Sequence, residues 1–125
     1  MKPDEDQKKE TLMAALFVWF DLTTTHGEEV RTFYADPFGW TIGRGGGEYL
    51  GWMTEGEQPW AGIAAGDAGR WVPYVVVDGL DSATKQATAL GGTVVRAKTA
   101  GPAGTSVLMA DHGGAVVALF TPAAG

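Results

Sequence analysis

Hydrophobic and polar positions follow two spacings that alternate along this chain. Residues 16–22 read LFVWFDL and residues 71–77 read WVPYVVV, and both are rich in the aromatic and β-branched side chains that favour strands. After the first of them, Val30, Phe33 and Tyr34 lie at helical spacing and form one apolar stripe. Three shorter strand-like stretches follow each helical stretch. The pattern therefore predicts a strand, a helix and three strands, and then the same order again.

This order is an internal repeat with a period of about 53 residues. The letters FGWTI at 38–42 align with LGGTV at 90–94, and AGIA at 61–64 aligns with VALF at 117–120. We predict an α+β domain of two βαβββ modules that form a curved sheet around a cleft. The modules span 16–66 and 70–121, and the further strands are expected at 40–42, 49–53, 60–65, 93–96, 106–110 and 115–120.

Helix ends and loops have their own local signals. Thr25 and Glu28 have the spacing of a capping box for the first helix, and Pro37 is expected to end it. Asp78 is expected to cap the second helix. Glycine and proline at 98–105 predict a loop, which could cover the cleft or be an ordinary connection.

Length and charge narrow the classes of function. A chain of 125 residues predicts one domain, here placed at 13–122 after a disordered arm at 1–12. The formal net charge is −6 and the nine Lys and Arg residues are scattered, so no nucleic-acid partner is expected. The charged first ten residues do not resemble a signal peptide, and no apolar run reaches the roughly 20 residues that span a bilayer. We therefore expect a cytoplasmic protein that does not bind membranes.

Several short motifs occur in an order known from one superfamily. They are FY at 33–34, FGW at 38–40, WVPYVVVDGLD at 71–81, ALGG at 89–92 and ADHGGA at 110–115. Together they resemble the signatures of the vicinal oxygen chelate superfamily, which includes glyoxalases, bleomycin-resistance proteins and extradiol dioxygenases. The resemblance implies the two-module fold predicted above, a small-molecule ligand and a homodimer.

The same resemblance implies positions for a divalent metal ion. Metal-dependent members hold the ion with His or Gln on the first strand of each module and Glu on each fourth strand. Aligned on the motifs, these positions hold Trp19, Val72, Gly62 and Ala118, and none of these side chains is a metal ligand. We therefore predict no metal cofactor, which argues against metal-dependent glyoxalase or dioxygenase activity.

Without a metal, the cleft is predicted to bind an organic ligand directly. Because side chains alternate between the two faces of a strand, we expect Trp19, Asp21 and Tyr74 to point into the cleft. The pattern does not assign Trp52 and Trp60 to either face. Aromatic walls with a few polar groups suit a flat organic molecule. The candidate ligand-binding residues are Trp19, Asp21, Trp52, Trp60, Gly62, Val72, Tyr74, Ala118 and Phe120.

Three functions fit these observations. The first is a metal-free binding protein that resembles the antibiotic-sequestering members of the superfamily. The second is a glyoxalase- or dioxygenase-like enzyme, either with Asp21, Glu48 or Tyr74 as acid or base or with metal ligands at other positions. The third is a structural module whose cleft is filled. His26 and His112 are lone histidines at a helix start and a turn, and we interpret them as surface residues.

Overall fold

Each half of the chain folds as a strand, a helix and three further strands, in the predicted order. The computed structural model describes residues 16–47 and 49–123, so the arm predicted at 1–12 and Glu48 lie outside the described residues. The first half consists of β1 (Phe17–Thr24), α2 (Gly27–Phe38), β2 (Thr41–Arg44), β3 (Tyr49–Glu55) and β4 (Gln58–Ala65). The second half consists of β5 (Arg70–Val76), α3 (Leu80–Ala89), β6 (Thr93–Gly101), β7 (Gly104–Ala110) and β8 (Val116–Pro122).

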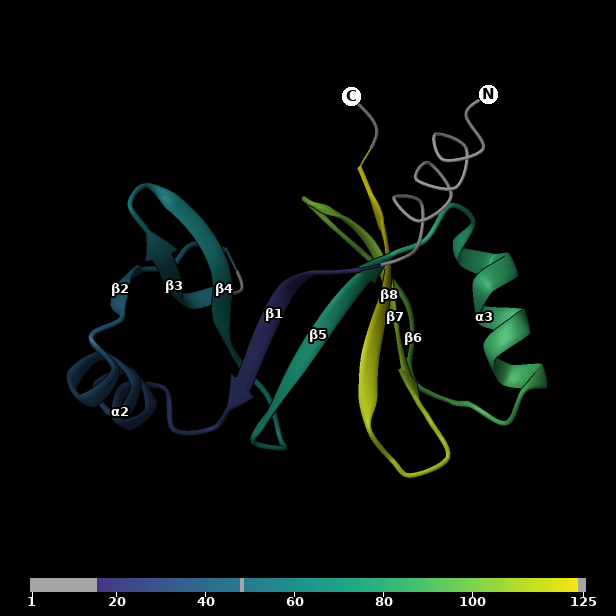
Figure 1. The fold of residues 1–125 in the computed structure, drawn as a ribbon, viewed down its shortest axis with the longest axis horizontal. Helices are drawn as coiled ribbons and strands as arrows, with labels where there is room; N and C mark the ends of the chain where they lie inside the picture. The colour runs from purple at the N-terminus through teal and green to yellow at the C-terminus, as the bar shows by residue number, and fades with distance from the viewer. Residues whose placement is uncertain (1–15, 48, 124–125) are drawn as a thin grey trace, which may run out of the picture.

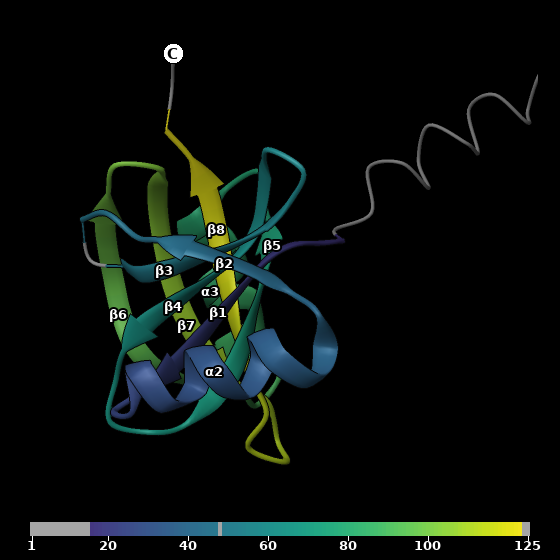
Figure 2. The same ribbon diagram turned by 90° about the vertical axis from the view of Figure 1, so that its left-hand side faces the viewer.

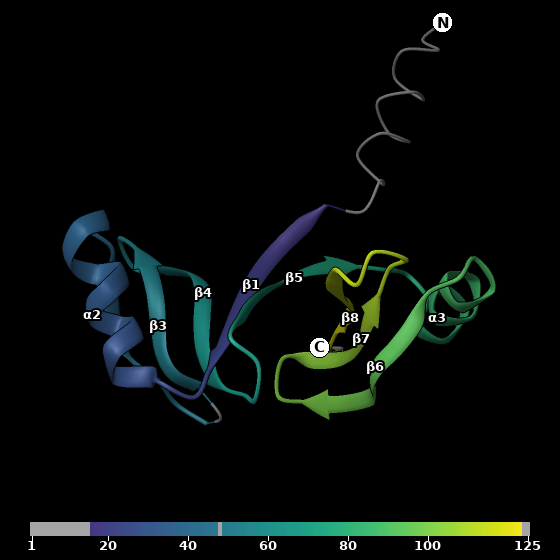
Figure 3. The ribbon, with the colours of Figure 1, turned by 90° about the horizontal axis from the view of Figure 1, so that it is seen from below.

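All eight strands join into one sheet in the order β2-β3-β4-β1-β5-β8-β7-β6. The central strands β1 and β5 are antiparallel, while each pairs in parallel with the last strand of its own half, β4 or β8. Figure 1 shows the two halves on either side of β1 and β5, and Figure 3 shows a curved sheet that does not close. The predicted α+β fold is confirmed.

Each helix covers its own half of the sheet, and each has a separate hydrophobic core beneath it (Figure 2 shows α2 lying across the strands of the first half). The core under α2 is formed by Leu22, Met53, Ala61 and Ile63, and the core under α3 by Leu80, Val107, Met109 and Leu119. Half-buried rings pack around the first of these cores. We call them the outer cluster: Phe20, Tyr34, Trp40, Trp60 and Trp71.

The helix ends differ from the prediction. Neither helix has a side-chain cap, because His26 and Gly79 occupy the N-cap positions in place of Thr25 and Asp78. Thr25 Oγ1 is instead 2.9 Å from His26 Nδ1. Pro37 lies inside the last turn of α2, where the missing amide donor does not stop the helix. The helix ends at Phe38, and the C-cap residue Gly39 has a φ of 71°, which is favourable for glycine.

The loop predicted at 98–105 is wrong, because β6 continues to Gly101 and β7 begins at Gly104. Thr99 pairs with Ser106 and Ala100 with Thr105, so this segment is a β-hairpin. Backbone pairing overrides the local turn signal, and a Gly104 φ of 152° accommodates the tight connection. Among the helices of residues 16–123, apart from residue 48, none is long and apolar enough to cross a membrane.

Candidate functional site

A buried carboxylate lies on the face of the sheet that is turned away from the helices, which we call the inner face. Asp21 in β1 is 8% exposed. Its Oδ1 accepts hydrogen bonds from Trp19 Nε1 and from the Tyr49 hydroxyl, each at 2.7 Å. Its Oδ2 accepts one from the Tyr74 hydroxyl, also at 2.7 Å. Because such charge-assisted bonds are strong and directional, one carboxylate holds aromatic side chains from β1, β3 and β5.

Strand alternation explains how Asp21 reaches this face. In β1, Trp19 and Asp21 point to the inner face, while Phe20 and Leu22 point to the core under α2. Burying the side chains on one side fixes the register, and a slip of one residue would turn the carboxylate into the apolar core.

A glycine makes room for the second tyrosine. Gly62 in β4 is the parallel-strand partner of Asp21. A Cβ atom added there would overlap the Tyr49 ring and would approach Trp19 Cζ2 at 3.3 Å. The absence of a side chain at Gly62 therefore allows Tyr49 to lie over β4 and reach Asp21.

Other rings surround this hydrogen-bonded group. Trp52 packs against Trp19 and Tyr49, with ring centroids 5.9 and 4.3 Å apart. Tyr74 packs edge-on against Phe120, at 5.7 Å. Arrangements of this kind stabilise aromatic pairs beyond simple burial. We call the set the inner cluster: Trp19, Asp21, Tyr49, Trp52, Tyr74 and Phe120.

The two tyrosines of the inner cluster keep their protons. Burial raises the pKa of Tyr49 far above its usual range, and the charge of Asp21 and the hydrogen bond to it raise it further. Burial and the hydrogen bond to Asp21 also raise the pKa of Tyr74. Both phenols are therefore neutral donors at neutral pH, which favours a structural or binding role for Tyr74 over the role of a base.

An arginine continues the network into the second half of the sheet. Arg96 Nη2 in β6 donates a hydrogen bond of 2.6 Å to Ser106 Oγ in β7, and Ser106 is 7% exposed. Ser106 pairs with Phe120 in the sheet, and Phe120 packs against Tyr74, so Arg96 is held on the same side as that tyrosine. The positive charge of Arg96 lowers the pKa of Tyr74, against the larger effects of burial and of Asp21. Polar side chains thus extend along the inner face from Asp21 and Tyr74 to Arg96 and Ser106.

Most of the residues predicted from the sequence meet on this face. Trp19, Asp21, Trp52, Tyr74 and Phe120 belong to the inner cluster. The smaller predicted residues lie in the strands beside them. Val72 pairs with Asp21, and Ala118 pairs with Tyr74; both side chains are almost completely buried.

Trp60 is the predicted site residue that lies elsewhere. It packs against Phe20 and Trp40, with ring centroids 6.5 and 4.9 Å apart, in the outer cluster. Simple alternation would place it with Gly62, but the pairing of β3 with β4 shifts register between Met53 and Thr54. A bulge of this kind re-aims nearby side chains, so Trp60 is not part of the candidate site.

The sequence did not indicate three members of the polar network: Tyr49, Arg96 and Ser106. Register shifts between Tyr49 and Gly51 and between Val94 and Arg96 break the alternation that would have assigned two of them to the inner face. The aromatic character of Tyr49, in a strand that was predicted, was the one available signal.

The residues on the inner face do not fit the divalent metal ion that the resemblance to the vicinal oxygen chelate superfamily implies. The strand register places Asp21 beside Gly62 and Tyr74 beside Ala118, so one carboxylate stands where several ligands would be needed. Three aromatic donors already occupy both of its oxygens. In the part of the chain that the structure describes, no three His, Cys, Asp or Glu side chains gather into a possible metal site.

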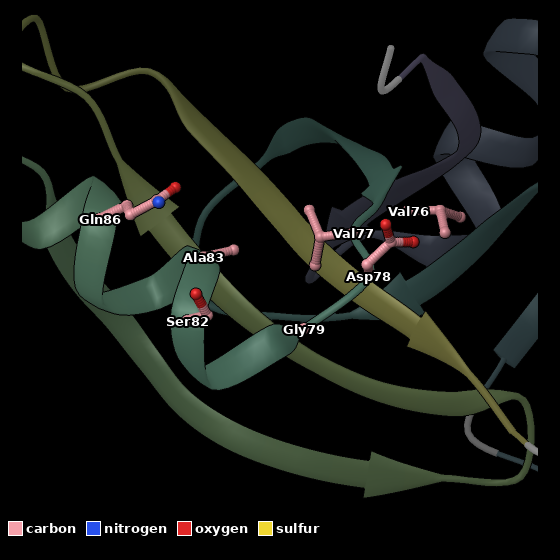
Figure 4. A pocket seen from close by; sticks show the side chains of 7 residues that line it. All are labelled: Val76, Val77, Asp78, Gly79, Ser82, Ala83 and Gln86. Carbon is pink, nitrogen blue, oxygen red and sulfur yellow. The ribbon is translucent and has the colours of Figure 1, made fainter. Parts of the chain in front are cut away.

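Two pockets lie away from this network. One, of about 290 Å³, opens beside the start of α3 (Figure 4). The other, of about 480 Å³, lies next to the outer cluster and includes Trp40 and Trp60. Neither gathers a charged network like that of the inner face. The first is lined by Val76, Val77, Asp78, Gly79, Ser82, Ala83 and Gln86.

Comparison with known proteins places this geometry in a family. Residues 17–120 match the family model described as glyoxalase-like domain. No curated protein has a significantly similar sequence. A hypothetical protein from Bacillus halodurans C-125 superposes with a TM-score of 0.63 at 9% identity, over 90% of this chain and 97% of the other.

Solved structures of homoprotocatechuate 2,3-dioxygenase from Brevibacterium fuscum are also similar. One variant superposes with a TM-score of 0.62 at 18% identity, over 88% of this chain and 33% of the dioxygenase. A complex with 3,4-dihydroxyphenylacetate gives 0.61 at 18% identity, over 86% and 37%. This chain thus spans about a third of the dioxygenase, and at such identities the likeness concerns the fold alone.

Proposed function

The chain belongs to the glyoxalase-like family of the vicinal oxygen chelate superfamily, and from this premise we propose that it binds a small, flat aromatic molecule on its inner face without a divalent metal. The observation that carries the proposal is the Asp21 carboxylate and the three aromatic donors that it holds. Where metal-dependent members of the superfamily have metal ligands, this chain has an ordered aromatic surface around Asp21.

Pre-organisation supports a binding role. Trp19 and Tyr49 have their polar atoms engaged by Asp21, so their ring orientations are fixed before a ligand arrives. Rings that do not need to be ordered lose less conformational entropy on binding. Trp52 adds a further ring beside both, so a flat ligand can stack without rearranging the site.

Binding without conversion fits the protonation of the site better than catalysis does. A general base must be able to accept a proton from the substrate. Tyr49 and Tyr74 are neutral phenols, and both oxygens of Asp21 already accept hydrogen bonds. Sequestration of a drug-like molecule, as in the antibiotic-resistance members of the superfamily, needs no such base.

The test combines thermal melting with tryptophan fluorescence. Bicyclic aromatic compounds form one arm of the panel, and Ni²⁺, Zn²⁺, Mn²⁺ and Fe²⁺, each with and without a chelator, form the other. A ligand at a hundred times its Kd adds about 2.7 kcal/mol, which raises the melting temperature of a domain of this size by several degrees. We expect aromatic compounds to raise it and to be recovered unchanged.

Matched variants locate the binding. Trp52→Phe changes a ring of the inner cluster and should weaken binding, whereas Trp60→Phe changes a ring of the outer cluster and should not. A rise in melting temperature with metals alone would contradict the proposal, and recovery of a converted compound would favour the enzyme.

Other properties stay predictions. The exposed apolar residues at the start of β1, Leu16, Phe17 and Val18, support the homodimer that the resemblance implies. Light scattering of the purified protein checks it. The domain bounds of 13–122 and the cytoplasmic location are likewise expectations, checked by limited proteolysis and by cell fractionation.

A further inference from the structure

We infer that the aromatic ligand carries a negatively charged, carboxylate-type group, and that Arg96 binds this group. The inference rests on the proposed function, since it names the chemical class of the ligand that the inner face takes. It follows from which polar groups of the face are already used and which are still available.

The acceptor on the inner face is already used. A carboxylate offers about four acceptor positions, and three donors occupy both oxygens of Asp21. The one position that remains is on a carboxylate that is only 8% exposed, so a cationic ligand has little access to it. The same three donors point at Asp21 and are not available to an anionic ligand either.

Arg96 is the cation beside this network. Its guanidinium has five N–H donors in a planar fork, of which one Nη2 donor is used by Ser106. Between residues that the structure describes, the salt bridge is that of Lys98 with Asp81, so none of their carboxylates pairs with Arg96. The Arg96 side chain is exposed, and its remaining donors are open to a ligand.

The surroundings hold the guanidinium in a defined position. Ser106 is buried and uncharged, so it orients Arg96 without neutralising it. Ser106 pairs with Phe120 in the sheet, and Phe120 packs on Tyr74, so a ring near this aromatic pair can direct a carboxylate toward the fork. The protein has a net charge of −6, so an anion depends on a local cation for its affinity.

The experiment uses three compounds with the same ring and different charge: 2-naphthoate, 2-naphthamide and 2-naphthylmethylammonium. Dissociation constants are measured by tryptophan fluorescence at low ionic strength for the wild type, Arg96→Gln, Arg96→Lys and Arg44→Gln. Arg44 is an exposed arginine at the edge of the sheet, so its variant controls for the loss of one positive charge.

We expect the wild type to bind naphthoate at least about tenfold more tightly than naphthamide, as charge-assisted hydrogen bonds require. Arg96→Gln should abolish this preference by weakening the binding of naphthoate much more than that of naphthamide. Arg96→Lys keeps the charge and a donor for Ser106, so it should retain part of the preference and controls for folding. Arg44→Gln should behave as the wild type.

Two results would overturn the inference while the proposed function stands: equal binding of naphthoate and naphthamide that Arg96→Gln leaves unchanged, or tightest binding of the ammonium compound. If none of the three compounds binds, the proposed function fails as well. The two failures are therefore distinguishable.

Discussion

Two aromatic clusters on opposite faces of the sheet have different chemistry. In the outer cluster, rings pack around Met53 and Ile63, and one indole-to-phenol hydrogen bond, from Trp71 to Tyr34 at 3.2 Å, joins them. In the inner cluster, three donors converge on a carboxylate. Phe20 and Trp19 are adjacent in sequence, yet they belong to different clusters. Ring content alone does not separate a core from a binding surface, whereas the partners of the polar atoms do.

The largest expected effect on stability lies on the outer side. Met53 is fully buried, so Met53→Ala should lower the free energy of unfolding by about 2–5 kcal/mol, through lost burial and the cavity left behind. Urea denaturation measures the change. Ligand affinity of the folded protein should stay the same, and a large loss of affinity would show that the two clusters are not independent.

On the inner face, Asp21→Asn should lower the free energy of unfolding by about 1–3 kcal/mol. The reason is that an amide cannot accept hydrogen bonds from all three donors that now bind the carboxylate. Ligand affinity should fall together with stability, in contrast to the Met53 variant. Asp36→Asn, on an exposed position of α2, is the control and should change neither quantity. An Asp21→Asn protein as stable as the wild type would contradict the role given to the carboxylate.

Gly62→Ala tests the space under Tyr49. The added methyl group overlaps the Tyr49 ring. We expect the free energy of unfolding to fall by about 1–2 kcal/mol, and the hydrogen bond from Tyr49 to Asp21 to weaken. Gly43→Ala, in β2, meets no atom within 4 Å and is the matched control. Thermal melting of both variants checks the difference, and equal melting temperatures would mean that Tyr49 moves away without cost.

Alkaline pH tests the two tyrosines of the inner cluster. In the unfolded chain tyrosine ionises near pH 10, but the raised pKa values keep Tyr49 and Tyr74 protonated in the fold. Above about pH 10 the unfolded state therefore binds fewer protons, and stability falls as the pH rises. The melting temperature followed from pH 8 to 12 should decline less steeply in Tyr49→Phe and Tyr74→Phe.

The smallest effect is expected where neither cluster is involved. Lys98 Nζ and Asp81 Oδ1 are 3.0 Å apart, but their side chains are 55% and 78% exposed. Asp81→Asn should change the free energy of unfolding by less than about 1 kcal/mol. A larger loss in urea denaturation would mean that α3 depends on this ion pair.

The fold could be predicted because its signal repeats. Two copies of one pattern of apolar spacing give the order of strands and helices, and each copy supports the other. Helix ends and the β6–β7 connection were less predictable. At the start of α2, the weak preference of Thr25 for a cap position did not decide where the helix begins. Between β6 and β7, the turn preference of Gly101 and Gly104 competes with backbone pairing that depends on distant residues.

The candidate site was predictable as far as strand alternation holds. Trp19, Asp21, Tyr74 and Phe120 follow it and reach the inner face as expected. Trp60 lies near a register shift, and its position depends on pairing that no single strand reveals. Arg96 also lies at a register shift, so the sequence alone did not place it on the inner face.

The pairing of β1 with β5 makes the centre of the inner face nearly symmetric in position but not in chemistry. Asp21 and Tyr74 are 53 residues apart, and Trp19 faces Tyr74 just as Val72 faces Asp21. Asp21 and Tyr74 thus occupy equivalent places around a pseudo-two-fold axis. In a symmetric pair of identical single modules, that place would hold two carboxylates, which repel, or two phenols, which lack a charged acceptor. Because the two modules are in one chain, the two places can differ, with an acceptor in one and a donor in the other.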